Sequence, residues 1–191
     1  VGWLERWPDW PLPLKGLNLH GPSGSGKTHL SNLWTGRGDA VALNSLFQFD
    51  QEQFLQKQHV VLDDFGVSGC YDDTAVFHLL NYITSVSGTL LFLSPYPVAQ
   101  HESSLSDLTS RLRSVAAQEI DLPDDGLLKA VLAKQFTDRQ CTVSEQVLNY
   151  IVNRMERSFS AAQQLSAEID ALALSRKVPI SLTIARQVLD S

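Results

Sequence analysis

The most informative motif in this chain is Gly21-Pro22-Ser23-Gly24-Ser25-Gly26-Lys27-Thr28. Its spacing is G-x-x-x-x-G-K-[ST], the P-loop pattern. The glycines let backbone N–H groups turn inward around phosphate oxygens, and the helix that follows adds the positive end of its dipole. Lys27 supplies a charge for the β- and γ-phosphates, and Thr28 supplies a hydroxyl for Mg²⁺. The alternative is a chance glycine-rich turn, which its position between a predicted strand and a predicted helix disfavours.

Apolar runs on both sides of this motif predict a parallel α/β sheet. Short strands are expected at Leu17–His20, Ala40–Leu43, His59–Asp63, Thr89–Leu93 and Gln118–Leu122. Helices are expected at residues 27–34, 46–56, 74–86 and 106–112, with Asp73 as the cap of the third. Strands that alternate with helices imply a parallel sheet with helices on both faces.

The strand signals fade after Pro123, and helical patterns replace them. Helices are expected at residues 124–136, 143–155, 160–175 and 184–189. Thr142 and Glu145 form a capping-box pattern for the second of these, and Thr183 is the expected cap of the last. The sequence therefore predicts two domains: an α/β nucleotide-binding domain over residues 1–122 and a small all-α lid over residues 123–191.

A second candidate motif is Val60-Val61-Leu62-Asp63-Asp64. An apolar strand that ends in Asp is how a P-loop protein places its Mg²⁺-binding carboxylate beside the phosphates. Asp63 fits that role, and Asp64 would then be the acid nearest the attacking water. The alternative is that the two acids only open a turn before Gly66.

A third candidate is the pair Arg111 and Arg113, at the end of the short helix after the fourth strand. An arginine there could neutralise transition-state charge on the γ-phosphate of a neighbouring molecule. The alternative is a solvated basic helix end that favours the helix dipole. Spacing alone does not separate the two interpretations.

Taken together, the P-loop, residues 60–64 and the run Asp107-Leu108-Thr109-Ser110-Arg111-Leu112 resemble the AAA+ module of the DnaA family. The resemblance covers nearly the whole chain and is closest to the Hda-like members, which lack the DNA-binding domain. In DnaA a helix-turn-helix domain would follow residue 191, just after the last predicted helix. The resemblance implies a P-loop AAA+ fold and a regulator that joins the DNA-loaded sliding clamp and promotes hydrolysis of DnaA-bound ATP.

The resemblance also assigns roles to individual residues. It implies that Arg111 is an arginine finger offered to the ATP of DnaA. The chain's own nucleotide, ADP or ATP, would be held by the eight P-loop residues and by His29, which follows them. Thr28 and Asp63 would hold its Mg²⁺. The clamp peptide of the family lies at the extreme N-terminus, and Val1–Leu14 carries no Gln-Leu-x-Leu-type motif, so we expect the clamp to be engaged by a tail not seen here.

The sequence departs from the family pattern in three places. The slot for the sensor-2 arginine reads Ser158–Gln163 and contains no arginine, and the sensor-1 region, Ser94–Pro97, contains no acidic or basic residue. The link between Lys27 and Asp63 is also short for the family. The first two departures predict weak intrinsic hydrolysis by a protein that keeps its nucleotide as a structural cofactor.

Composition narrows the function further. The net charge of −6 argues against direct DNA binding, and the two cysteines with no long apolar run predict a cytoplasmic protein with no membrane association. The five histidines show no spacing typical of metal ligands. The tryptophans Trp3, Trp7 and Trp10 could flank the adenine or pack against the lid or the sheet. The alternative function is a self-sufficient AAA+ ATPase, such as a helicase loader. A small P-loop kinase is a less suitable alternative, because the predicted lid is a regular helical unit. A homodimer is a further possibility that the sequence does not decide.

Overall fold

The structure is a computed structural model that describes residues 2, 6, 9–10, 14–36, 40–54 and 57–190. Contacts divide the chain into two compact units. We call residues 1–22 and 27–120 the sheet unit, and residues 23–26 and 121–191 the helical unit. Within the described ranges, no helix combines the length and apolar character needed to cross a membrane.

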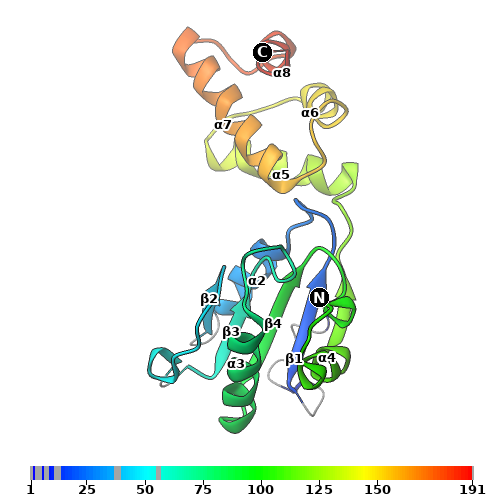
Figure 1. Cartoon of the computed structure of the whole chain (residues 1–191). Helices are drawn as coiled ribbons and strands as arrows, with labels where there is room; N and C mark the ends of the chain where they lie inside the picture. Colours follow the sequence, from blue (N-terminus) through cyan, green and yellow to red (C-terminus); the bar gives the residue numbers. More distant parts are fainter. Residues whose placement is uncertain are drawn as a thin grey trace. The chain divides into compact units, whose positions relative to one another are not determined.

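The sheet unit is built on five parallel strands in the order β2-β3-β4-β1-β5 (Figure 1). The strands are β1 (Gly16–His20), β2 (Ala40–Leu43), β3 (His59–Leu62), β4 (Thr89–Ser94) and β5 (Ala116–Glu119). The helices between them are α2 (Lys27–Thr35), α3 (Asp73–Ser85) and α4 (Ser106–Arg113), with short 3₁₀ turns η1 (Gln51–Phe54) and η2 (Val98–Gln100). The predicted parallel α/β sheet is confirmed.

Successive residues of the central strands point to opposite faces of the sheet, and each face has its own apolar core. Val60 and Leu62 of β3 pack in one core with side chains of α3 and α4, whereas Val61 packs in the other core with Trp34 of α2. Both cores are closed to solvent at these strands. Helices therefore cover both faces, as the alternation of strands and helices predicts.

The carboxyl ends of β1 and β3 lie at the same edge of the sheet, because all the strands are parallel. The P-loop follows β1 and Asp63 follows β3, and β4 lies between these two strands. In parallel sheets of this kind, ligands bind outside the carboxyl ends of the strands. This edge is the place to look for a site.

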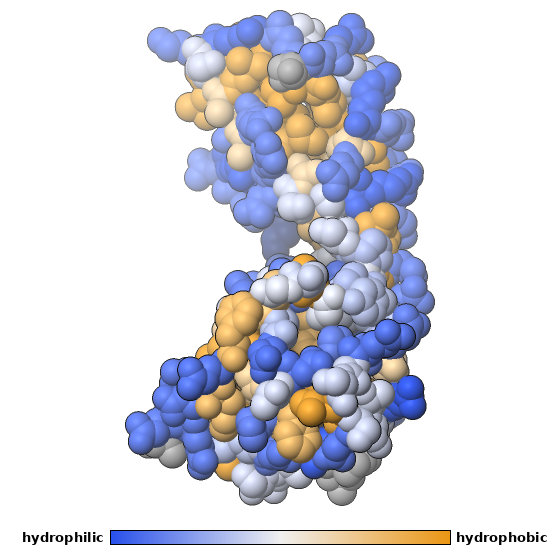
Figure 2. Space-filling model, in the orientation of Figure 1, coloured by the Kyte–Doolittle hydropathy of each residue, from blue (hydrophilic) through white to orange (hydrophobic). Residues whose placement is uncertain are grey.

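The helical unit consists of α5 (Asp125–Asp138), α6 (Glu145–Val152), α7 (Phe159–Arg176) and α8 (Leu182–Leu189). Its apolar core takes side chains from all four helices, including Leu132, Ile151, Ile169 and Ile184. Figure 2 shows apolar residues gathered between these helices and hydrophilic residues around them. One buried polar contact crosses the core, where Ser166 Oγ donates to Gln135 Oε1 at 2.7 Å.

The helix predicted over residues 46–56 is wrong in the part that the structure describes. Only the 3₁₀ turn Gln51–Phe54 forms there, and Leu46 lies in an isolated parallel bridge with Tyr71. The Leu46 N–H donates to Cys70 O, and Leu46 O accepts from Asp72 N–H, which holds this segment extended. The Asp50 carboxylate accepts from the N–H of Glu52 at 2.9 Å and so caps the start of this short turn.

Three predicted helix caps are also wrong. The N-cap of α3 is Asp72, whose carboxylate accepts from Ala75 N–H at 2.9 Å, while Asp73 is the first helical residue. Helix α6 begins after Ser144 and not after the Thr142 of the predicted capping box. Helix α8 begins after Ser181, so Thr183 lies inside it. In each case two short polar side chains lie within three residues of each other near the helix start, and the sequence does not say which one takes the extended cap conformation.

The last strand is displaced from its predicted position. β5 spans Ala116–Glu119, whereas residues 118–122 were the predicted range. Its position is fixed by pairing with β1, where Leu17 lies opposite Ala116 and His20 lies opposite Glu119.

Candidate functional site

The P-loop has the backbone that its glycines allow. Gly24 and Gly26 have φ angles of +79° and +93°, in the left-handed region that disfavours other residues. At Gly21, a Cβ atom would lie 2.1 Å from the carbonyl oxygen of Ile120. The contacts of Ser23–Gly26 group these four residues with the helical unit, where Gly24 O accepts from the N–H of Phe159 at 3.4 Å.

Ser25 carries a polar atom that the described residues leave without a partner. Its side chain is 3% exposed, and its Oγ has no hydrogen bond among these residues. A buried hydroxyl without a partner costs free energy. Its position inside the loop fits a segment shaped to receive an external polar group.

Lys27 is the first residue of α2, and its ammonium lies against the loop. Nζ donates to Gly21 O at 2.7 Å and to Pro22 O at 2.9 Å. Burial lowers the pKa of Lys27, and the nearby carboxylates of Asp63 and Asp64 act against that shift. The three charges therefore share one locality at the carboxyl edge of the sheet.

The structure brings Thr28 and Asp63 together. Thr28 Oγ1 donates to Asp63 Oδ2 at 3.1 Å, from the first turn of α2 to the residue after β3. Asp63 Oδ1 accepts from the N–H of Asp64 at 2.9 Å, so both carboxylate oxygens have partners. Asp64 is exposed and has a φ angle of +54°. His29 lies in the same turn as Thr28, is exposed and makes no described hydrogen bond or ring contact.

Thr28 and Asp63 have the donor chemistry that Mg²⁺ prefers. Mg²⁺ is usually bound by one or two protein oxygens together with substrate phosphates and waters. No group of three or more His, Cys, Asp or Glu side chains able to hold a metal ion is present in the described part of the chain. One carboxylate and one hydroxyl beside a P-loop thus fit a magnesium ion that arrives with a phosphate ligand.

Two tyrosines hold the residues that follow β3, and no sequence pattern predicts their role. The Tyr71 hydroxyl donates to Asp63 O and to Leu43 O, and the Tyr96 hydroxyl donates to Gly66 O at 2.6 Å. Neither tyrosine stands at a spacing that marks it, because both contacts depend on where separate loops end. Asn18 does carry a sequence signal, because it is a polar residue between two leucines of β1. A buried polar side chain in an apolar strand indicates a hydrogen-bond partner nearby.

Arg111 lies in the last turn of α4 and belongs to the sheet unit. Its guanidinium is 3.3 Å from the Asp107 carboxylate and 5.3 Å from the ring centroid of Phe77. No described contact joins Arg111 to Lys27 or Asp63. The contacts that the structure describes for the Arg111 guanidinium go to Asp107 and Phe77.

The described tryptophan of the entry segment packs against the sheet. Trp10 stacks on Trp34 with ring centroids 5.6 Å apart, and His59 lies edge-on to Trp34. His59 begins β3, so this cluster lies at the opposite edge of the sheet from Asp63. The packing alternative is the one observed for Trp10, and Trp3 and Trp7 lie outside the described residues.

The strand order β2-β3-β4-β1-β5, with a P-loop after β1 and an acid after β3, defines an AAA+ P-loop fold. Comparison with solved structures gives the same class. Domain III of the Thermotoga maritima replication initiation protein DnaA aligns with a TM-score of 0.75 and 17% identity, over 99% of this chain and 88% of that one. A T. maritima RuvB mutant structure aligns with a TM-score of 0.70 and 14% identity, over 92% of this chain and 61% of that one.

DnaA is also a relative in sequence. The chromosomal replication initiator protein DnaA of Tropheryma whipplei, in the strains Twist and TW08/27, is 27% identical over 145 residues. The match covers 76% of this chain and 28% of each relative, so the chain corresponds to just over a quarter of the curated proteins it matches. No family model matches the chain. The chain thus has the fold of DnaA domain III and a distant relationship to DnaA.

A third solved structure adds information about ligands of that relative. A replication initiator DnaA bound to AMPPCP and single-stranded DNA aligns with a TM-score of 0.65 and 15% identity. The alignment covers 92% of this chain and 62% of that one.

Proposed function

We propose that this chain binds an adenine nucleotide, ADP or ATP, through its P-loop. The observation that carries the proposal is the hydrogen bond between Thr28 and Asp63 beside Lys27. Thr28 and Asp63 would hold Mg²⁺, which neutralises phosphate charge when bound. The AMPPCP in a DnaA structure of the same fold supports adenine as the base.

The particular function we propose is that of an Hda-like regulator of replication initiation in the cytoplasm. It would stimulate hydrolysis of DnaA-bound ATP by offering Arg111 to the γ-phosphate, in concert with the sliding clamp. The sequence relationship to DnaA supports a partner in replication initiation, and we propose DnaA itself. The described contacts of Arg111, to Asp107 and Phe77 and not to the chain's own Lys27 or Asp63, support an action in trans.

Weak intrinsic hydrolysis is part of the same proposal. Two side chains near the end of β4 are hydroxyls that donate to backbone carbonyls: Ser94 Oγ donates to Tyr96 O at 2.6 Å, and the Tyr96 hydroxyl donates to Gly66 O. No charged side chain stands in Ser94–Pro97 or in Ser158–Gln163 to stabilise a developing phosphate charge.

The test is phosphate release from ATP-loaded DnaA in the presence of DNA-loaded sliding clamp, with and without this protein. Each component is also measured alone. We expect a rise in phosphate release only in the complete mixture. Fast turnover by this protein alone would overturn the regulator and leave the self-sufficient ATPase, such as a helicase loader, as the better function.

A further inference from the structure

The acidic turn, defined as residues Asp63–Gly66, has two residues in a backbone conformation that L-amino acids rarely adopt. Asp64 and Gly66 both have left-handed φ angles, +54° and +85°. A non-glycine residue in this region costs free energy and persists only where the surroundings enforce it. The turn is nevertheless the segment that presents Asp63 to Thr28. Main-chain bonds hold its first half, from Asp63 N–H to Leu43 O at 2.8 Å and from Phe65 N–H to Leu93 O at 2.9 Å, and side chains outside the turn add to them.

Tyr71 holds the first end of the turn. Its hydroxyl hydrogen is shared between Asp63 O and Leu43 O, the latter at 2.7 Å, and so ties the ends of β2 and β3 together. The Tyr71 ring packs on Phe65 of the turn, with centroids 5.4 Å apart. Burial, with Asp63 and Cys70 nearby, raises the pKa of Tyr71 above its ordinary value, so the phenol keeps the proton that it donates.

Tyr96 holds the second end of the turn from the other side. Its hydroxyl donates to Gly66 O at 2.6 Å. Its own carbonyl accepts from Ser94 Oγ at 2.6 Å, and Ser94 Oγ accepts from Asn18 Nδ2 at 2.7 Å. Asn18 is fully buried in β1, three residues before the P-loop begins. A chain of hydrogen bonds thus runs from the strand that carries the P-loop to the turn that carries Asp63.

We infer that Tyr71 and Tyr96 form a tyrosine clamp, a pair of positioning residues that hold Asp63 in place for the Mg²⁺ of a bound nucleotide. The inference rests on the proposed nucleotide binding. The clamp fixes the main chain of the turn at Asp63 and at Gly66, while Thr28 and the Asp64 N–H fix the carboxylate itself. Metal ligands commonly depend on such outer contacts for their orientation.

The clamp predicts a specific loss in a binding measurement. The affinity for ADP is measured by calorimetry in excess Mg²⁺ and again in EDTA, and the ratio of the two affinities is the Mg²⁺ contribution. A typical hydrogen bond contributes about 1 kcal/mol, which is about fivefold in an equilibrium constant. We expect Tyr71→Phe and Tyr96→Phe each to reduce the Mg²⁺ contribution by about fivefold, with little change in the affinity measured in EDTA.

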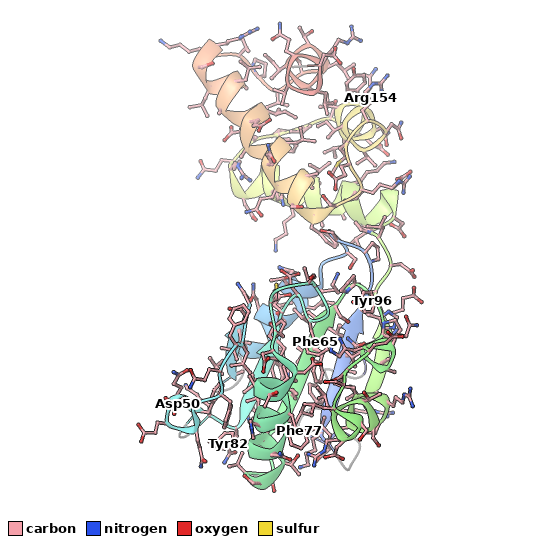
Figure 3. The ribbon with its side chains drawn as sticks, viewed as in Figure 1. Asp50, Phe65, Phe77, Tyr82, Tyr96 and Arg154 are labelled. Carbon is pink, nitrogen blue, oxygen red and sulfur yellow. The ribbon has the colours of Figure 1, made fainter. Side chains whose placement is uncertain are left out.

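The matched control is Tyr82→Phe. The Tyr82 hydroxyl also donates to a backbone carbonyl of the sheet unit, Phe54 O at 2.5 Å. Figure 3 shows Tyr96 and Phe65 toward one end of the sheet unit and Tyr82 toward the other. We expect Tyr82→Phe to leave the Mg²⁺ contribution unchanged, although it removes the same chemical group and lowers the thermal midpoint.

The outcomes separate the clamp from the function on which it rests. If the parent protein binds ADP with a Mg²⁺ contribution and both phenylalanine variants keep it, the clamp is wrong and nucleotide binding stands. If the parent shows no Mg²⁺-dependent binding, the proposed function fails and the clamp fails with it. Tyr96 is 39% exposed, so Tyr96→Phe keeps the test decisive even if Tyr71→Phe does not fold.

Discussion

The guanidinium of Arg111 lies 5.3 Å from the ring centroid of Phe77 and forms an ion pair with Asp107 one helical turn earlier. Both contacts are weak in water: an exposed cation–π contact contributes about 0.5–1 kcal/mol and an i,i+4 pair about 0.3–0.5 kcal/mol. These contacts hold the arginine in a defined place. Because both are weak, a stronger interaction with an anionic partner would readily replace them.

The first prediction concerns this arginine. Arg111→Ala is expected to fold, because the contacts it removes are small, and to bind ADP as the parent does. Stimulation of ATP hydrolysis by DnaA should fall by about 10³-fold or more, the usual contribution of an arginine finger. The measurement is phosphate release in the complete mixture with the clamp.

Arg113→Ala is the matched control for that experiment. Arg113 ends the same helix two residues later and is exposed. We expect it to keep most of the stimulation. Equal losses in the two variants would show that general positive charge at the end of α4 matters and that Arg111 has no particular role.

The second prediction concerns the carboxylate that Thr28 contacts. Asp63→Asn removes the charge but keeps the shape, so the Mg²⁺ contribution to ADP affinity should fall by about tenfold or more, as expected for a hydrogen-bonded charged group. Asp64→Asn is the control, since asparagine tolerates the left-handed φ of +54° at that position. Calorimetry in Mg²⁺ and in EDTA distinguishes them, and equal effects would remove the distinction between the two acids.

The third prediction concerns the first P-loop glycine. Gly21→Ala places a Cβ 2.1 Å from a backbone carbonyl at a φ of +149°, whereas Gly69→Ala has a φ of +82° with nothing within 4 Å. Gly69→Ala should therefore show only the left-handed penalty of about 1 kcal/mol, and Gly21→Ala should lose more. Thermal unfolding checks this, with about 2–4 °C expected per kcal/mol. A larger loss at Gly69 would contradict it.

The fourth prediction concerns pH. The pKa of Tyr71 is raised above its ordinary value of 10.0 chiefly by burial. Above pH 10 the unfolded chain releases this proton and the folded chain keeps it, so the folded state binds more protons and the free energy of unfolding falls as pH rises. The Tyr71→Phe variant has no phenol at this position, so its free energy of unfolding lacks this contribution to the pH dependence.

Urea unfolding of the parent and of Tyr71→Phe, from about pH 9 to about pH 11, tests the sign of this effect. The stability advantage of the parent should be constant below the ordinary pKa and shrink above it. An advantage that grows with pH would show that the phenol ionises more easily in the folded protein.

The sheet could be predicted from the sequence because its central strands β1, β3 and β4 are buried on both faces and are largely apolar runs. Leu62 ends such a run, and Gly21 opens the glycine-rich loop after another. The predicted strand boundaries agree with the observed ones to within one residue, except at β5, which contains Ala116, Ala117, Gln118 and Glu119 and has no apolar run of its own. Its position comes from pairing with β1, which local sequence does not encode.

The tyrosines and the helix starts could not be predicted, for two different physical reasons. Tyr71 and Tyr96 act through backbone carbonyls of residues distant in the chain, and every residue offers a carbonyl, so no side-chain pattern marks the partner. Ser144 and Ser181 compete with neighbouring polar residues as N-caps, and the choice follows the path of the incoming chain. The contact between Thr28 and Asp63 could be predicted, because the P-loop pattern and an apolar strand that ends in Asp are both typical of a magnesium–phosphate site.

The parallel pairing of the sheet has a kinetic consequence. Each strand finds its neighbours only across long stretches of chain, as when residue 17 pairs with both residue 91 and residue 116. Long-range pairing of this kind makes folding slow, whereas the local contacts of a helical unit form quickly. During refolding, helical circular dichroism should therefore recover before the ability to bind ADP. The time at which ADP binding returns would then report when the sheet is complete.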